Sequence, residues 1–153
     1  MKDYIVDASV IAKWLLPEPD HDGARVLIDA PCSLRAPDLI MPEVASIVLK
    51  RIMRHELTFD EGSELLQLFQ DEFIGARVRI IPSRLLAEHA LQIARTEGRG
   101  IYDSLYVALA VQAQCRLITA DEKLVNGIRN KVLKQHVVAL KDPALQADLA
   151  AQV

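Results

Sequence analysis

The sequence predicts an α/β fold: a three-layer α/β/α sandwich with a central, mainly parallel sheet. Short apolar runs recur along the 153 residues, as in strands that are buried on both faces. Segments with helical spacing of apolar residues separate these runs, which is the pattern of a chain of β-α units. No repeat, low-complexity segment or linker interrupts the sequence, so we expect one domain over residues 1–153.

The first elements are expected close together at the N-terminus. Residues 4–6 (YIV) indicate a strand, and residues 10–16 indicate a helix that Pro17 ends. An apolar face predicts a second helix at residues 24–28, and a weaker strand signal follows at residues 33–36. These four segments therefore begin the alternation of strands and helices.

The clearest helix is expected at residues 41–56, where Pro42 suits the first helical position. Apolar residues recur there at helical spacing: Val44, Ile47, Val48 and Ile52. Another helix is expected at residues 59–73, and residues 78–81 indicate a strand that Pro82 ends.

The C-terminal half continues the alternation. Ser83 is placed to cap a helix at residues 84–96, which Gly98 and Gly100 end. A helix at residues 103–114 has a broad apolar surface, so we expect it to be central. The remaining elements are a strand at residues 117–119, a helix at 121–128, a strand at 136–140 and a marginal amphipathic helix from residue 142 onward.

The composition restricts the class of protein. It is 51% hydrophobic and 25% charged, as in a globular protein, and its net charge of -3 argues against binding nucleic acid over the whole surface. Cys32 and Cys115 provide no disulfide framework and no metal spacing, so we expect reduced core thiols. We find no signal peptide and no run of ~20 apolar residues, which predicts a cytoplasmic protein without membrane contact.

Four acids lie where strands end or helices begin. Asp7 and Asp121 each follow an apolar run, and Glu43 and Asp103 each lie near the start of a helix. In an open α/β sheet, these positions share the edge at the carboxyl ends of the strands. Crowded acids repel each other and lose hydration, and bound Mg²⁺ or Mn²⁺ relieves both costs. The pattern therefore predicts a site for a hard divalent cation.

Each acid also has a purely structural explanation. Asp7, Asp103 and Asp121 can cap the helices that follow them, and Glu43 can interact favourably with a helix dipole. Ser9 is an equally good cap for the first helix, which would leave Asp7 free to face the strand ends. The coincidence of four acids at one edge is what favours the metal site.

Four segments resemble PIN domains, specifically the VapC-type toxins of prokaryotic toxin–antitoxin pairs. They are VDASVIAKWLLPE from residue 6, PDLIMPEVASIVLK from residue 37, IYDSLYVALA from residue 101 and LITADEKL from residue 117. The acids of the family correspond to Asp7, Glu43, Asp103 and Asp121, and Ser9 matches its small hydroxyl residue. The resemblance implies a Mg²⁺- or Mn²⁺-dependent ribonuclease, usually dimeric, that a small antitoxin holds inactive.

A metal-assisted hydrolysis of the RNA backbone gives each of the four acids a role. We expect Asp7 and Asp103 to be direct metal ligands. Asp121 and Glu43 are expected to complete the shell directly or through water, and one of them to orient the attacking water.

Residues near the acids are expected either to orient the carboxylates or to contact the RNA. Ser9 and Thr119 are candidates for orienting the acids. Trp14 and Tyr102 have aromatic faces that could stack a base, although core packing explains Trp14 better. The candidate cations for RNA contacts are Lys13, Arg99 and Arg116, each of which is also explained as a solvated surface charge.

Two other α/β classes need residues that this sequence lacks. A phosphate-transfer enzyme with a nucleophilic aspartate would need a second aspartate two residues after Asp7, where Ser9 stands. A Rossmann domain would need a glycine-rich turn after the first strand, and none follows it. A PIN-like module that binds RNA or protein without cutting stays open, because intact acids do not demonstrate turnover.

Overall fold

The computed structural model describes residues 1–152, and in it five parallel strands form one sheet in the order β3-β2-β1-β4-β5. The strands are β1 (Lys2–Val6), β2 (Cys32–Pro37), β3 (Val78–Ile81), β4 (Arg116–Thr119) and β5 (Val137–Ala139). All five expected strands are therefore confirmed, with small differences at their ends.

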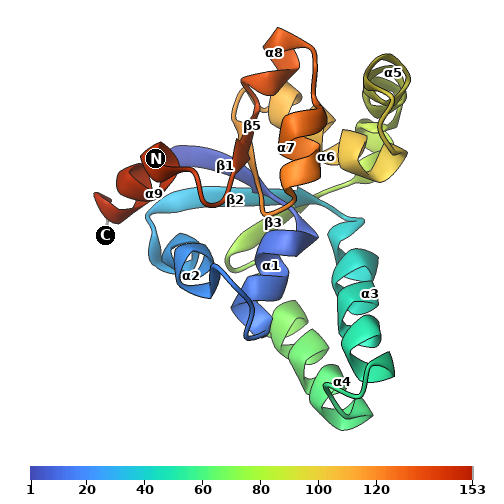
Figure 1. Ribbon diagram of the computed structural model, residues 1–153, viewed down its shortest axis with the longest axis vertical. Coiled ribbons are helices and arrows are strands. Elements are labelled where there is room, and N and C mark those ends of the chain that lie inside the picture. The colour runs from blue at the N-terminus through green and yellow to red at the C-terminus, as the bar shows by residue number, and fades with distance from the viewer. Residues whose placement is uncertain (153) are drawn as a thin grey trace.

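Helices cover both faces of this sheet. They are α1 (Ala8–Leu15), α2 (His21–Asp29), α3 (Ile40–Met53), α4 (Phe59–Leu68), α5 (Ala87–Glu97), α6 (Ile101–Gln112), α7 (Glu122–Gly127), α8 (Lys131–Lys134) and α9 (Pro143–Ala150). A π-helical turn, η1 (Phe69–Phe73), extends α4, and a 3₁₀ turn, η2 (Ser83–Leu85), precedes α5. Figure 1 shows α1 to α4 on one side of the strands and α5, α7 and α8 on the other. The three-layer α/β/α sandwich is confirmed.

The core is centred on β1 and α6. All apolar residues of β1 are buried, and α6 packs across β1, β2 and β4. Seven consecutive residues of α6, from Ser104 to Ala110, are buried, which agrees with the central position expected for this helix. Cys32 is a buried free thiol, as expected, whereas Cys115 is also free but only half-buried.

Two helix starts differ from expectation. The helix expected at residue 41 begins at Ile40, so Pro42 is its third residue and still needs no intrahelical hydrogen bond. Ser83 does not cap the next helix, because its backbone N–H donates to Asp38 Oδ1 at 3.1 Å and its hydroxyl donates to the same oxygen. Residues 83–85 form η2 instead, and α5 begins at Ala87 without a side-chain cap.

The C-terminal elements pack back on the sheet. Helix α8 was not expected. Asn130 caps it, because its side-chain oxygen accepts hydrogen bonds from the N–H groups of Val132 and Leu133. The tail forms α9, which buries Leu145 and Leu149. Tyr4 donates a hydrogen bond to Asp148, so α9 lies beside the start of β1, and Figure 1 shows both there. Within residues 1–152, no helix has the length and apolar character needed to cross a membrane.

Candidate active site

The four acids lie on elements that meet at the carboxyl edge of the sheet. Asp7 directly follows β1, and Asp121 lies two residues after β4, the strand next to β1. From β1 the chain builds the sheet through β2 and β3 on one side and then returns to add β4 and β5 on the other. Ligands of open α/β sheets bind at such a reversal of strand order. Glu43 and Asp103 lie in the first turns of α3 and α6.

Asp7 is buried and fixed by hydrogen bonds to both carboxylate oxygens. Its Oδ1 caps α1, accepting from the N–H groups of Ser9 at 3.0 Å and Val10 at 3.3 Å. The hydroxyl of Ser9 donates to Oδ1, and the hydroxyl of Thr119 donates to Oδ2. Asp7 and not Ser9 is therefore the cap, and the idea that Ser9 frees Asp7 from capping is wrong.

Thr119 and Ser9 join the ends of β1 and β4. The Ser9 hydroxyl oxygen accepts a hydrogen bond from Ala120 N–H at 3.0 Å, and the Thr119 hydroxyl oxygen accepts one from Asp121 N–H at 3.0 Å. Thr119 is fully buried. Each hydroxyl thus donates to Asp7 and accepts from the backbone that leads into Asp121, which fixes the two acids relative to each other.

Thr119→Val is expected to lower the free energy of unfolding by about 1–3 kcal/mol, because it keeps the shape but leaves an Asp7 oxygen and the Asp121 N–H without partners. Urea unfolding of the metal-free protein measures this change. Thr96→Val is the matched control: its hydroxyl donates only to carbonyls of its own helix, and the residue is exposed. Equal losses in both variants would contradict a special role for Thr119.

Glu43 is half-buried and is held by Tyr106. The Tyr106 hydroxyl donates to Glu43 Oε1 at 2.8 Å, which ties α3 to α6. Burial raises the pKa of the Glu43 carboxyl, and the charges of Asp7 and Asp103 raise this pKa further. Burial and the charges of Glu43 and Asp7 raise the pKa of Tyr106, so the phenol stays protonated and remains a donor. Sequence reasoning missed Tyr106, which resembles one more core residue in an apolar helix.

Asp103 and Asp121 complete the cluster at its more open side. Burial raises the pKa of Asp103, the charge of Asp121 raises it further, and the charge of Arg99 lowers it. Asp103 accepts no hydrogen bond from any described residue, whereas Asp121 Oδ1 caps α7 by accepting from the N–H groups of Lys123 and Leu124. Capping thus explains part of the role of Asp7 and Asp121, but it does not explain Glu43 or Asp103.

The charges of the four acids influence one another, but the acids do not form a complete set of metal ligands as they stand. The charge of Asp7 acts on Glu43, that of Asp103 acts on Glu43, and that of Asp121 acts on Asp103. Burial is also the main cause of the raised pKa of Asp7. In the part of the chain that the structure describes, no three acidic, histidine or cysteine side chains are arranged to hold a metal ion as they stand.

Residues 4–127 match the sequence profile of the PIN domain. The chain belongs to the PIN-domain family. It is 32% identical over 120 residues to Ribonuclease VapC3 from Pyrobaculum aerophilum, covering 78% of this chain and 90% of that relative. The resemblance to VapC-type PIN domains that the four motifs indicated is thereby confirmed.

Solved structures share the fold of this PIN domain. PAE2754 from Pyrobaculum aerophilum superposes with a TM-score of 0.71 at 20% identity, covering 99% of this chain and 91% of that one. VapBC2 from Rickettsia felis, bound to a DNA fragment from its promoter, gives a TM-score of 0.60 at 14% identity, covering 90% of this chain and 98% of that one. At these identities the likeness concerns the fold.

Within the PIN domain, two of the three cations expected beside the RNA are placed elsewhere. Lys13 is buried, and its ammonium donates to the Pro19 carbonyl at 2.6 Å and lies 3.5 Å from the Glu18 carboxylate. Lys13 is therefore enclosed by the loop after α1 and is not a rim cation. The sequence places Lys13 one turn along the first helix, but it does not show that the following loop folds back over this side chain.

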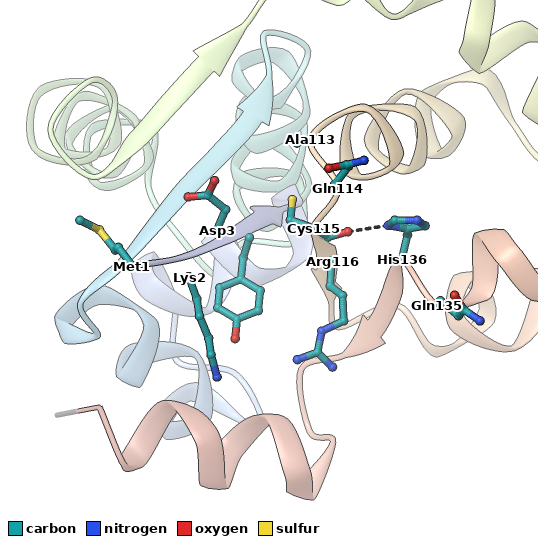
Figure 2. A pocket seen from close by; sticks show the side chains of 10 residues that line it. Met1, Lys2, Asp3, Ala113, Gln114, Cys115, Arg116, Gln135 and His136 are labelled. Carbon is teal, nitrogen blue, oxygen red and sulfur yellow. Dashed lines mark hydrogen bonds between the residues drawn. The ribbon is translucent and has the colours of Figure 1, made fainter.

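Arg116 lies at the wrong end of the sheet for a contact beside the acids. It is the first residue of β4, whereas Thr119 is the last residue of that strand and Asp121 follows two residues later. Figure 2 shows Arg116 in a separate hollow near Met1, Lys2 and His136, and its guanidinium lies over the Tyr4 ring at 6.0 Å. The expectation of an RNA contact next to the acids is therefore wrong for Arg116.

Arg99 remains beside the acids. Its guanidinium donates to the Lys123 carbonyl, packs against Gly127 and lowers the pKa of Asp103 through its charge. The Arg99 side chain thus joins the start of α6 to α7. Its contact with RNA stays a prediction.

Glu43→Gln is expected to stabilise the metal-free PIN domain by an amount that grows as the pH rises above about 4. The folded protein raises the pKa of Glu43, so the native state holds its proton at pH values where the unfolded state has lost it. The stability contributed by this group is therefore present below its unfolded pKa and is lost as the pH rises through the folded pKa. The glutamine oxygen can still accept the Tyr106 hydrogen bond. Melting temperatures in EDTA over a pH series measure the difference, and a constant or shrinking difference would contradict the argument.

Proposed function

We propose that this PIN domain is a Mg²⁺- or Mn²⁺-dependent endoribonuclease that hydrolyses RNA phosphodiester bonds. The observation that carries the proposal is the meeting of Asp7, Glu43, Asp103 and Asp121 at the reversal of strand order, with three raised pKa values among them. The 32% identical relative that is named a ribonuclease supports the choice of RNA. The motif resemblance points to the same activity.

The donor chemistry fits a hard divalent cation. Carboxylate oxygens are the ligands that Mg²⁺ and Mn²⁺ prefer, and Mg²⁺ needs only one or two of them because it keeps several waters. An incomplete set of carboxylate ligands is compatible with that mode of binding. Asp7 and Asp103 would hold the ion directly, and Asp121 and Glu43 would hold it directly or through water.

When bound, the cation supplies positive charge for the phosphoryl oxygens and lowers the pKa of a water molecule. The protein residues orient the reaction. Ser9 and Thr119 fix both oxygens of Asp7, and Tyr106 fixes one oxygen of Glu43, leaving Oε2 for a water molecule. Oε2 of Glu43 would accept a proton from the attacking water, and burial raises the pKa of this carboxyl, which makes it a stronger base.

The proposal includes a protein partner. The family resemblance implies the toxin of a type II toxin–antitoxin pair, with a cognate antitoxin and a homodimeric state, and the fold shared with the VapBC2 complex is consistent with an antitoxin. Co-expression with the product of a neighbouring gene tests the partner, and light scattering of the purified protein tests the dimer. A complex that leaves RNA cleavage unchanged would contradict an inhibitory antitoxin.

The test of the activity is cleavage of RNA in Mg²⁺ or Mn²⁺ compared with EDTA. We expect defined fragments with either ion and intact RNA in EDTA. A module that only binds RNA would instead retain the RNA on a gel without producing fragments in any condition. Binding without metal-dependent cleavage would therefore select that alternative over the nuclease.

A further inference from the structure

A pocket of about 390 Å³ lies beside the acids, between α3 and the start of α6. Its walls are mainly apolar, and Leu39, Pro42 and Ile47 contribute to them. Glu43 and Tyr102 also line the pocket. Glu43 thus belongs both to this pocket and to the acid cluster, and Tyr102 precedes Asp103 in the chain. A group bound in the pocket is therefore next to the proposed reaction centre.

One face of α3 supplies most of the chemistry of the pocket. Glu43, Ser46, Ile47 and Lys50 have the spacing i, i+3, i+4 and i+7, which places them on the same side of a helix. Along this face the pocket presents a carboxylate, a hydroxyl, an apolar side chain and an ammonium group. Lys50 is exposed and takes part in no ion pair among residues 1–152.

Tyr102 differs from the other tyrosines of the chain. Tyr4 and Tyr106 are each 2% exposed and donate hydrogen bonds to carboxylates. Tyr102 is 64% exposed, and its hydroxyl has no hydrogen-bond partner in the described structure. Neither packing nor hydrogen bonding within residues 1–152 thus accounts for an aromatic ring at this position. An exposed ring beside an apolar pocket provides a flat surface on which a nucleobase can stack.

We propose that the pocket seats one unpaired nucleobase of the RNA, next to the bond that is cut, against Tyr102. The Ser46 hydroxyl contacts the base edge, and Lys50 contacts a neighbouring phosphate. The inference rests on the proposed nuclease function, and it requires the bound base to be unpaired, because a paired base cannot enter a pocket in this way. An aromatic ring, a hydroxyl and a cation without an ion-pair partner lie together beside Glu43, and this combination suits a nucleotide better than an apolar peptide.

Kinetics of the full chain on a short single-stranded RNA that the parent cuts at one mapped bond test the proposal. We expect Tyr102→Leu to raise KM about 5- to 150-fold, which corresponds to the ~1–3 kcal/mol lost with a base–aromatic stack, with little change in kcat. Tyr102→Phe keeps the ring and should keep the parental KM. Phe59→Leu is the matched control, since Phe59 is 73% exposed and lies at the start of α4, outside the pocket.

An abasic substrate identifies the base that is bound. Removing that one base should raise the parental KM by a similar factor, and it should have little further effect on Tyr102→Leu. Lys50→Gln should lower the slope of log KM against log salt concentration by about 0.7, as expected for one lost phosphate contact on a single strand.

The outcomes separate this inference from the proposed function. If the parent cuts RNA and Tyr102→Leu has the parental KM, the base pocket is overturned while the nuclease stands. If Tyr102→Leu changes only the inhibition by a co-expressed protein, the pocket holds a peptide and the inference is also overturned. If the parent neither binds nor cuts RNA, the proposed function itself fails and this inference fails with it.

Discussion

Asp7→Asn and Asp103→Asn are each expected to reduce RNA cleavage about 100-fold or more in Mg²⁺ or Mn²⁺. Residues that merely orient metal ligands cost about 10–100-fold when they are replaced, so loss of a direct ligand should cost at least as much. Initial cleavage rates on one RNA, with the rate in EDTA as the baseline, measure the effect. Both substitutions remove a negative charge and nearly preserve the size of the side chain.

The two variants differ in their structural side effects. In Asp7→Asn, the amide oxygen can still accept the capping hydrogen bonds from Ser9 and Val10, but an NH₂ group then meets the Thr119 hydroxyl. Some loss of stability is therefore expected, and circular dichroism must confirm that the variant is folded. Asp103 accepts no hydrogen bond within residues 1–152, so Asp103→Asn removes its charge without that complication.

Glu122→Gln provides the control for removing a nearby negative charge. Glu122 is exposed, follows Asp121 in the chain and pairs with Lys141 at 2.6 Å. We expect this variant to cleave RNA at the parental rate. Undiminished cleavage by both aspartate variants would show that Asp7 and Asp103 are not the ligands, and an equal loss in Glu122→Gln would show that local charge, and not coordination, is responsible.

The sequence was sufficient to predict the layers and the edge of the sheet on which the acids lie. Strand β3 has the expected residues, 78–81, because Pro82 ends a short apolar run. Asp7 and Asp121 each follow such a run, so their position at the carboxyl ends of strands depends only on local pattern. That β1 and β4 are neighbours is a long-range pairing, and the local pattern does not contain it.

Side-chain partners were predicted less well, because they depend on contacts between distant segments. Tyr106 donates to an acid 63 positions away, and Thr119 donates to one 112 positions away. Thr119 was predicted because it lies two residues before Asp121, whereas Tyr106 lies in an apolar helix, where the local pattern does not distinguish it from a core residue. Lys13 was misplaced because the loop after α1 covers it.

The position of Arg116 could have been derived from strand geometry. Arg116 precedes Thr119 by three residues on β4, and a parallel strand rises about 3.3 Å per residue, so the two are separated by about 10 Å along the sheet. Arg116 is close to Asp121 in the sequence, but this does not bring it close to the acids in space. The direction of a strand decides which of its flanking residues reach the functional edge.

Added Mn²⁺ is expected to raise the melting temperature of the parent by about 5–10 °C when its concentration is 100 times the dissociation constant. Binding at that ratio adds about 2.7 kcal/mol to the stability of the folded state, and about 1 kcal/mol corresponds to ~2–4 °C in a domain of this size. Asp103→Asn should weaken the site, so its shift at the same Mn²⁺ concentration should be clearly smaller. Glu122→Gln should shift like the parent.

Without metal, Asp103→Asn is expected to melt at a higher temperature than the parent. An acid in the first turn of α6 gains about 0.3–1 kcal/mol from the helix dipole, which asparagine loses. The raised pKa of Asp103 shows that burial and the charge of Asp121 outweigh the favourable charges around it, Arg99 included. Removing the charge therefore removes a net cost at neutral pH. Differential scanning fluorimetry in EDTA and in Mn²⁺ measures both effects, and equal Mn²⁺ shifts in parent and variant would exclude Asp103 from the metal site.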